Sequence, residues 1–135
     1  MGRAALDFFA AFGAGRFDDA RQKTSAGFKW FGRVIQDAEW EGEKLAAYVK
    51  SSALAASHPR EVPSAIIDTW LEDRAARLFD GVLEDGDIVI LVDIRRHGET
   101  STSGVVVGVD ATRGNVVRRV FDPHELSVAL SSIHA

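Results

Sequence analysis

Two stretches of the chain decide the fold: GDIVILVDIRRHG at residues 86–98 and GVVVGVDATRGNVVRRVF at residues 104–121. β-Branched residues are denser there than anywhere else in the chain, and such residues between turn signals favour strands. A sheet made from these strands has an apolar face that needs a cover. The rest of the chain must supply that cover.

We predict a meander of four antiparallel strands in this half of the chain. The first strand ends at Asp85-Gly86, which is a strong hairpin signal. The strands are expected over 77–84, 87–96, 105–109 and 116–121, with turns at 98–103 and 110–114.

The preceding residues predict mainly helices. Leu6, Phe9 and Ala10 recur at helical spacing, and the segment 64–76 fits a helix although its residues also alternate as in a strand. Two prolines make 58–63 the clearest loop. Helices are expected over 3–12, 16–24, 43–56, 64–76 and from Asp122 onward, with short extended pieces at 28–31 and within 34–40.

Composition narrows the function classes. The 135 residues are 46% hydrophobic and 27% charged, as in an ordinary globular protein, and their number fits one domain over 1–135. A net charge of −4 without a long basic cluster argues against nucleic acid as a partner. No cysteine is present, no apolar run is long enough for a membrane, and the N-terminus lacks a signal-peptide layout. We therefore expect a cytoplasmic protein.

The order of helices, one short strand, another helix and a long antiparallel meander is α+β. Several stretches together resemble the SnoaL-like branch of the nuclear transport factor 2-like superfamily. The stretches are FFAAFGAGRFDDA at 8–20, FKWFG at 28–32, WEGEKLAAYV at 40–49, GDIV at 86–89 and GVDATRGNVVR at 108–118. The resemblance implies a cone, in which a curved sheet wraps around N-terminal helices, with a pocket in its mouth, a short C-terminal helix and a homodimer through the sheet.

The superfamily contains isomerases, cyclases, dehydratases, epoxide hydrolases and non-catalytic modules, so fold alone leaves function open. In its ketosteroid isomerase branch a Tyr and an acid polarise a carbonyl while an Asp moves the proton. At the matching positions this chain carries Phe8, Phe31 or Gly32, and Val105. None of these side chains can do that chemistry, so the isomerase mechanism is not expected.

One strand carries candidate catalytic residues. Asp93, Arg95 and His97 alternate along 87–96, so they share one face, opposite the aliphatic face of Ile88, Ile90, Val92 and Ile94. If their face lines the cone, Asp93 could act as base, Arg95 as its partner and His97 as a second proton carrier. The pair resembles, in reversed order, the Arg and Asp of limonene epoxide hydrolases. If their face points outward, the same residues form a solvated or interface ion pair.

Aromatic residues could wall a pocket for a small, largely apolar molecule, or could simply form the core. The candidates are Phe9, Phe12, Trp30, Trp40, Tyr48 and Trp70. Four scattered histidines without paired spacing give no metal site, and no phosphate-loop spacing or other cofactor signature is found. Two hypotheses follow: a small-molecule-binding cone domain with or without acid–base activity, or a non-catalytic dimerisation module whose aromatics fill the pocket.

Overall fold

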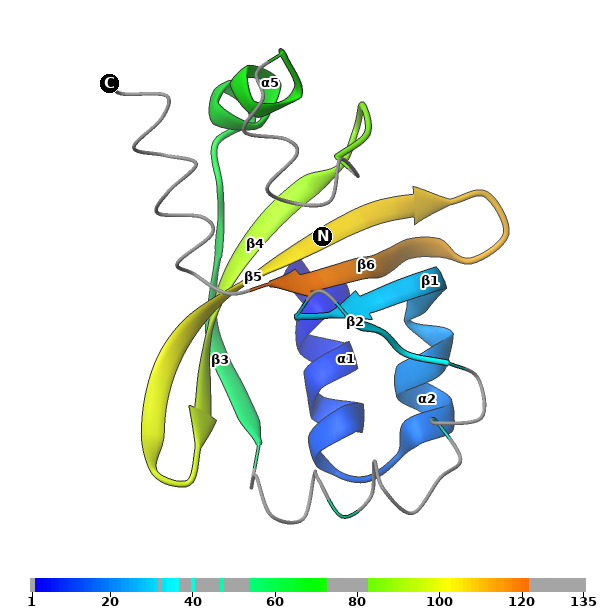
Figure 1. Ribbon diagram of the computed structural model, residues 1–135, viewed down its shortest axis with the longest axis vertical. Helices are drawn as coiled ribbons and strands as arrows, with labels where there is room; N and C mark the ends of the chain where they lie inside the picture. Colours follow the sequence, from blue (N-terminus) through cyan, green and yellow to red (C-terminus); the bar gives the residue numbers. More distant parts are fainter. Residues whose placement is uncertain are drawn as a thin grey trace.

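The computed structural model describes residues 2–31, 33–36, 40, 47, 54–72 and 83–121, with the side chains of residues 69–72 excepted. In this part of the chain, helices pack on a six-stranded sheet (Figure 1). The helices are α1 (Gly2–Gly13), α2 (Phe17–Gln22) and α5 (Ser64–Glu72); the strands are β1 (Thr24–Trp30), β2 (Arg33–Val34), β3 (Ala55–Glu61), β4 (Ile88–Arg96), β5 (Glu99–Asp110) and β6 (Gly114–Phe121).

The strands run in the order β2-β1-β6-β5-β4-β3 across the sheet. Every neighbouring pair is antiparallel except β1 and β6, which are parallel. The predicted α+β class is confirmed. The short C-terminal helix expected from Asp122 lies outside the described residues.

Helix α1 covers one face of the sheet, which we call the inner face. Its buried residues recur at helical spacing: Ala5, Phe8, Phe9, Ala11 and Phe12. At its end the helix approaches the chain before β3 so closely that a Cβ on Gly13 would lie 2.5 Å from the carbonyl oxygen of Leu54. Glycine at this position therefore allows α1 to lie against the start of β3.

Successive side chains of β4 point to opposite faces of the sheet, so its residues divide between two hydrophobic clusters. Ile88, Ile90, Val92 and Ile94 join α1 in the inner core. Val89 and Leu91 belong to a second cluster on the opposite, outer face, beneath α5. Other members of that cluster are Val62, Ile66, Ile67, Leu83, Val106 and Phe121. The uniformly aliphatic face of β4 is thus the one that the N-terminal helix covers.

The loop prediction for 58–63 is wrong for most of its length, because residues 58–61 belong to β3. Proline lacks the N–H that a central strand needs, but it is tolerated at bulges and on edge strands. Pro59 sits where the β3–β4 register shifts between Ser57 and Arg60, next to His58 with φ of 51°. Strand β3 is also an edge strand of the described sheet. Pro59 therefore sits both at a bulge and on an edge strand, the two places where a sheet tolerates proline.

The predicted four-stranded meander needs two corrections. Asp85-Gly86 does form a turn, but the second neighbour of β4 is β3 rather than a strand over 77–84. The turn placed at 98–103 is too long: His97 and Gly98, with φ of 54° and 81°, suffice, and Arg96 already pairs with Glu99. Such φ values suit the tight hairpin turns whose twist matches the strands.

The remaining helix and strand predictions have mixed outcomes. The helices predicted over 3–12 and 16–24 and the extended piece at 28–31 are found with shifted ends as α1, α2 and β1. The helix predicted over 64–76 is found as α5 as far as Glu72, and the extended piece expected within 34–40 overlaps β2 at Val34. The helix expected over 43–56 lies largely outside the described residues, and its last two residues, Ala55 and Ala56, begin β3 instead. Most of 73–84 also lies outside them, and Leu83 and Glu84 are not in a strand.

Candidate functional site

Aromatic rings fill the space between α1 and the inner face. Phe8 lies at the centre, with ring centroids 5.2 Å from Phe9, 5.6 Å from Phe12 and 5.3 Å from Phe28. Phe12 stacks on Trp30 at 5.1 Å. Phe8, Phe9, Phe12 and Phe28 are all at most 3% exposed, so these rings pack as a core and do not line an empty interior.

Within the described residues, this inner core holds no titratable side chain. In the described part of the chain all of its buried members are apolar. Ser103, 3% exposed, lies on the same face as Val105 two residues later, but its hydroxyl does not titrate in the ordinary pH range. Acid–base chemistry inside the cone would need a carboxylate or an imidazole. The described residues place neither there.

Asp93 lies on the outer face and is held by other strands. Its Oδ1 accepts hydrogen bonds from Nη1 and Nη2 of Arg60, both at 3.1 Å, and from Oγ1 of Thr102 at 3.0 Å. Burial raises the pKa of Asp93, but the hydrogen bonds from Thr102 and Arg60 outweigh it and leave the pKa below its ordinary value. Asp93 is therefore a stably ionised carboxylate and a weak base.

The structure does not bring the three candidate catalytic residues together as a set. Arg95 and His97 are exposed, and the cation bound to Asp93 is Arg60 from β3. All three lie on or beyond the outer face, away from α1, which counts against their action on a substrate inside the cone. Their catalytic roles remain a prediction.

Arg60 is the residue of this ion pair that the sequence did not reveal. It stands 33 positions before Asp93, inside the segment predicted as a loop. Within β3, Ala56 and Arg60 are the half-buried residues, on either side of three exposed residues where the pairing with β4 shifts register. Pro59 obscured that pattern in the sequence.

The predicted pocket aromatics separate into different environments. Phe12 and Trp30 pack in the inner core. Phe9 and Trp40 belong to the same core; Phe9 also lines a groove between α1 and the start of β3, and Trp40 also lines a separate cavity near α2. Tyr48 and the side chain of Trp70 lie outside what the structure describes.

The groove runs between α1 and the start of β3 and encloses about 430 Å³. Small residues create the hollow: Ala10 and Gly13 from α1, and Ala55 and Ala56 from β3. Leu6, Phe9 and Leu54 supply larger apolar surface. At one rim Arg3 and Asp7 form an exposed ion pair, with Nε and Oδ1 3.5 Å apart. The volume of the groove lies in the range of small-molecule sites.

A charged clasp joins the turn before β4 to β6 across the outer face. Nη1 of Arg118 donates to Oδ1 of Asp87 at 3.1 Å and to Oε2 of Glu84 at 2.9 Å. Burial raises the pKa of Asp87, although the backbone N–H of Glu84 and the Arg118 guanidinium act in the opposite direction. The clasp crosses Gly108, where a Cβ would lie 2.5 Å from Cδ of Arg118. The clasp therefore stabilises the fold by linking β6 to the turn before β4.

Two further features are absent from the described residues. No group of three or more His, Asp or Glu side chains is placed to hold a metal ion there. No helix in the same ranges is long and apolar enough to cross a membrane.

Solved structures provide the comparison that sequence does not, since no protein-family model and no curated protein matches the chain. A Shewanella frigidimarina protein provisionally identified as a ketosteroid isomerase aligns with a TM-score of 0.55 and 14% identity, over 88% of this chain and 90% of its own. A nuclear transport factor 2-like protein of unknown function from Cytophaga hutchinsonii aligns with a TM-score of 0.49 and 14% identity, over 94% of this chain and 95% of its own.

At this identity the likeness concerns the fold. The chain therefore has an α+β fold similar to that of the Shewanella frigidimarina protein.

Proposed function

We propose that the chain is a non-catalytic domain that binds a small, largely apolar molecule in the groove between α1 and β3. The filled inner core carries this proposal: Phe8, Phe9 and Phe12 occupy the space in which a cone enzyme would hold its substrate. No titratable side chain of the described residues joins them there. The proposed binding site therefore lies in the groove between α1 and β3, and not among the rings of the inner core.

The shape and lining of the groove support this choice of ligand. Its volume of about 430 Å³ suits a molecule of modest size. Leu6, Phe9 and Ala56 offer apolar contacts, and the only described charges at its rim, Arg3 and Asp7, pair with each other. A neutral apolar ligand leaves that pair intact. The cytoplasmic setting and the homodimer expected from the sequence belong to the same proposal.

Filling the groove tests the proposal. Ala10 is exposed and lines the groove, so Ala10→Phe should occupy the hollow from the helix side. Ala14, exposed and just beyond the end of α1, does not line it, which makes Ala14→Phe a matched control. The probe is N-phenyl-1-naphthylamine, a neutral dye whose fluorescence rises in apolar surroundings.

We expect the wild type and Ala14→Phe to bind the dye alike, and Ala10→Phe to bind it at least about tenfold more weakly. Equal binding by all three would refute the groove as the site. The absence of catalysis is tested separately, with a β,γ-unsaturated ketosteroid as substrate. Turnover above the rate in buffer would overturn that part of the proposal.

A further inference from the structure

Two contacts hold α1 against β3, one near each end of the groove. At one end a Cβ on Gly13 would lie 2.5 Å from the carbonyl oxygen of Leu54, and at the other a Cβ on Gly2 would lie 3.6 Å from Cβ of Pro59. A helix rises about 16 Å between these two glycines, and an extended chain covers about 16 Å from Leu54 to Pro59. The helix and the strand therefore lie side by side (Figure 1), and the two contacts set their spacing.

The contact at Pro59 exists because β3 contains a bulge. Ser57 pairs with Asp93. Arg60, three residues later, pairs with Leu91, which is only two residues from Asp93, so β3 has one extra residue. Since side chains alternate between the faces of a strand, an extra residue reverses the face that each following side chain takes. Pro59 consequently faces α1 on the inner side, and Arg60 points to the outer face.

Arg60 holds the bulge from the outer face. Its Nη1 donates to the carbonyl oxygen of His58 at 2.9 Å, and both Nη1 and Nη2 donate to Oδ1 of Asp93 at 3.1 Å. Asp93 is anchored in turn by the hydroxyl of Thr102, which donates to the same oxygen at 3.0 Å. His58 has a φ of 51°, a left-handed conformation that a residue with a side chain keeps only when its surroundings hold it.

We propose that Asp93 and Arg60 are positioning residues for the ligand groove, acting through the bulge of β3. Their ion pair fixes the carbonyl group of His58. Because this carbonyl group directly precedes Pro59, holding it determines how far Pro59 reaches toward α1, and so the spacing of α1 and β3 along the groove. The inference rests on the groove being the ligand site proposed above. Asp93 and Arg60 influence that site without touching a ligand.

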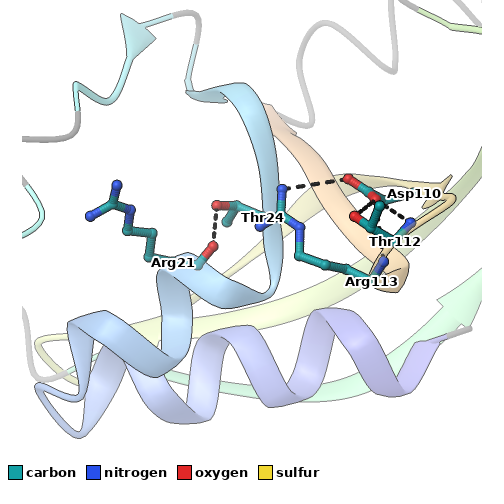
Figure 2. Close-up of polar contacts among 5 residues, drawn as sticks. All are labelled: Arg21, Thr24, Asp110, Thr112 and Arg113. Carbon is teal, nitrogen blue, oxygen red and sulfur yellow. Dashed lines mark hydrogen bonds and ion pairs between the residues drawn. The ribbon is translucent and has the colours of Figure 1, made fainter.

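Three variants test this role. Arg60→Met removes every donor but keeps a long side chain, Arg60→Lys keeps the charge without the two-pronged geometry, and Asp93→Asn removes the negative charge with little change of shape. Arg113→Met is the matched control. Arg113, with 41% of its side chain exposed against 34% for Arg60, also pairs with an aspartate, but in the turn between β5 and β6. Figure 2 shows it beside Asp110, with Nη2 and Oδ2 3.5 Å apart.

The first measurement needs no ligand. Two-dimensional NMR of the free protein follows the backbone amides of Arg3, Leu6 and Asp7, which lie on α1 and line the groove. These amide resonances should move in Arg60→Met and in Asp93→Asn, move less in Arg60→Lys, and stay in place in Arg113→Met. Dispersed spectra will show that each variant is folded. Should Arg60→Met fail to fold, Asp93→Asn carries the same test.

The second measurement is binding of N-phenyl-1-naphthylamine. Arg60→Met and Asp93→Asn should bind the dye about threefold to tenfold more weakly than the wild type, the range expected for residues that act through their neighbours. Arg60→Lys should lie between, and Arg113→Met should equal the wild type. A variant that merely loses stability keeps its folded groove, and hence its affinity, at temperatures well below its Tm.

The two measurements distinguish failure of this inference from failure of the proposed function. A wild type that binds no dye would refute the groove as the ligand site, whereas displaced α1 amides in Arg60→Met would still support the positioning of α1 by the ion pair. Unmoved α1 amides in Arg60→Met and Asp93→Asn would overturn the inference. So would wild-type dye affinity in both variants, or an equal loss of affinity in Arg113→Met.

Discussion

Replacing Gly108 with alanine should destabilise the protein by breaking the clasp over the outer face. The new Cβ would lie 2.5 Å from Cδ of Arg118 and 2.8 Å from Oδ1 of Asp87. Both distances are shorter than real Cβ contacts, so the ion pair must move. Gly108 is thus a site where glycine makes room for side chains that cross the strand.

The size of the effect follows from what is displaced. Overpacking alone costs about 1–3 kcal/mol. If Arg118 swings away, the side chain of Asp87, 3% exposed, stays buried without its cation, and breaking such a pair costs about 3–5 kcal/mol. The backbone N–H of Glu84 still donates to Asp87 at 2.8 Å. We therefore expect a loss of about 2–4 kcal/mol in the free energy of unfolding, or roughly 10 °C in Tm.

Urea unfolding of five proteins tests this reasoning: the wild type, Gly108→Ala, Arg118→Ala, the double variant and the control Gly2→Ala. Arg118→Ala removes the obstructing Cδ, so Gly108→Ala should cost less than about 1 kcal/mol in that background. Gly2→Ala is the control, because a Cβ there would meet nothing nearer than 3.6 Å. A Gly108→Ala variant as stable as the wild type, or an equal cost in both backgrounds, would refute the clash as the cause.

Three further predictions concern the sheet. Gly104→Ala places a Cβ in collision with Cζ, Cε1 and Cε2 of the Phe121 ring, and calorimetry should show a loss of about 1–3 kcal/mol. Because the pKa of Asp93 is lowered from 3.8 on folding, the ionised carboxylate stabilises the fold above that pH, and the contribution is lost as pH falls through the lower, folded value. The wild type should exceed Asp93→Asn in stability at pH 7, and the difference should shrink as acid protonates Asp93 in the folded protein. Light scattering should find a homodimer that Arg95→Glu, a change at an exposed outer-face position, converts to monomer; an unchanged mass would contradict a dimer through this face.

The sequence predicted those strands whose own residues have a strong preference for extended structure. The β-branched runs of β4, β5 and β6 were recognised because few other structures accommodate them, and the spacing of Phe9 and Ala10 revealed α1. β3 was missed because Pro59 is a strand residue only on an edge or at a bulge. Whether a strand lies on an edge is decided by the topology of the whole sheet, which no local pattern contains.

The candidate site was harder to predict for a similar reason. Period two correctly placed Asp93 and Arg95 on one face of β4, but it could not tell which face α1 covers. The partner of Asp93 was beyond reach as well, since Arg60 comes from the strand that was missed. The groove and the cavity near α2 both depend on small residues such as Ala55 and Gly27 meeting residues from distant elements, and alanine and glycine leave no distinctive pattern in sequence.

The parallel pairing of β1 with β6 has a consequence for how the chain folds. Thr24 lies opposite Val117 and Trp30 opposite Val120, so β1 gains its central neighbour only when the last strand arrives. Closing a loop of that length costs about 4 kcal/mol in chain entropy, and distant contacts of this kind slow folding. During synthesis on the ribosome, the aromatic residues of α1 and β1 must wait, partly exposed, until nearly the whole described chain has emerged. Chaperone binding to nascent chains should therefore end only after β6 has left the exit tunnel.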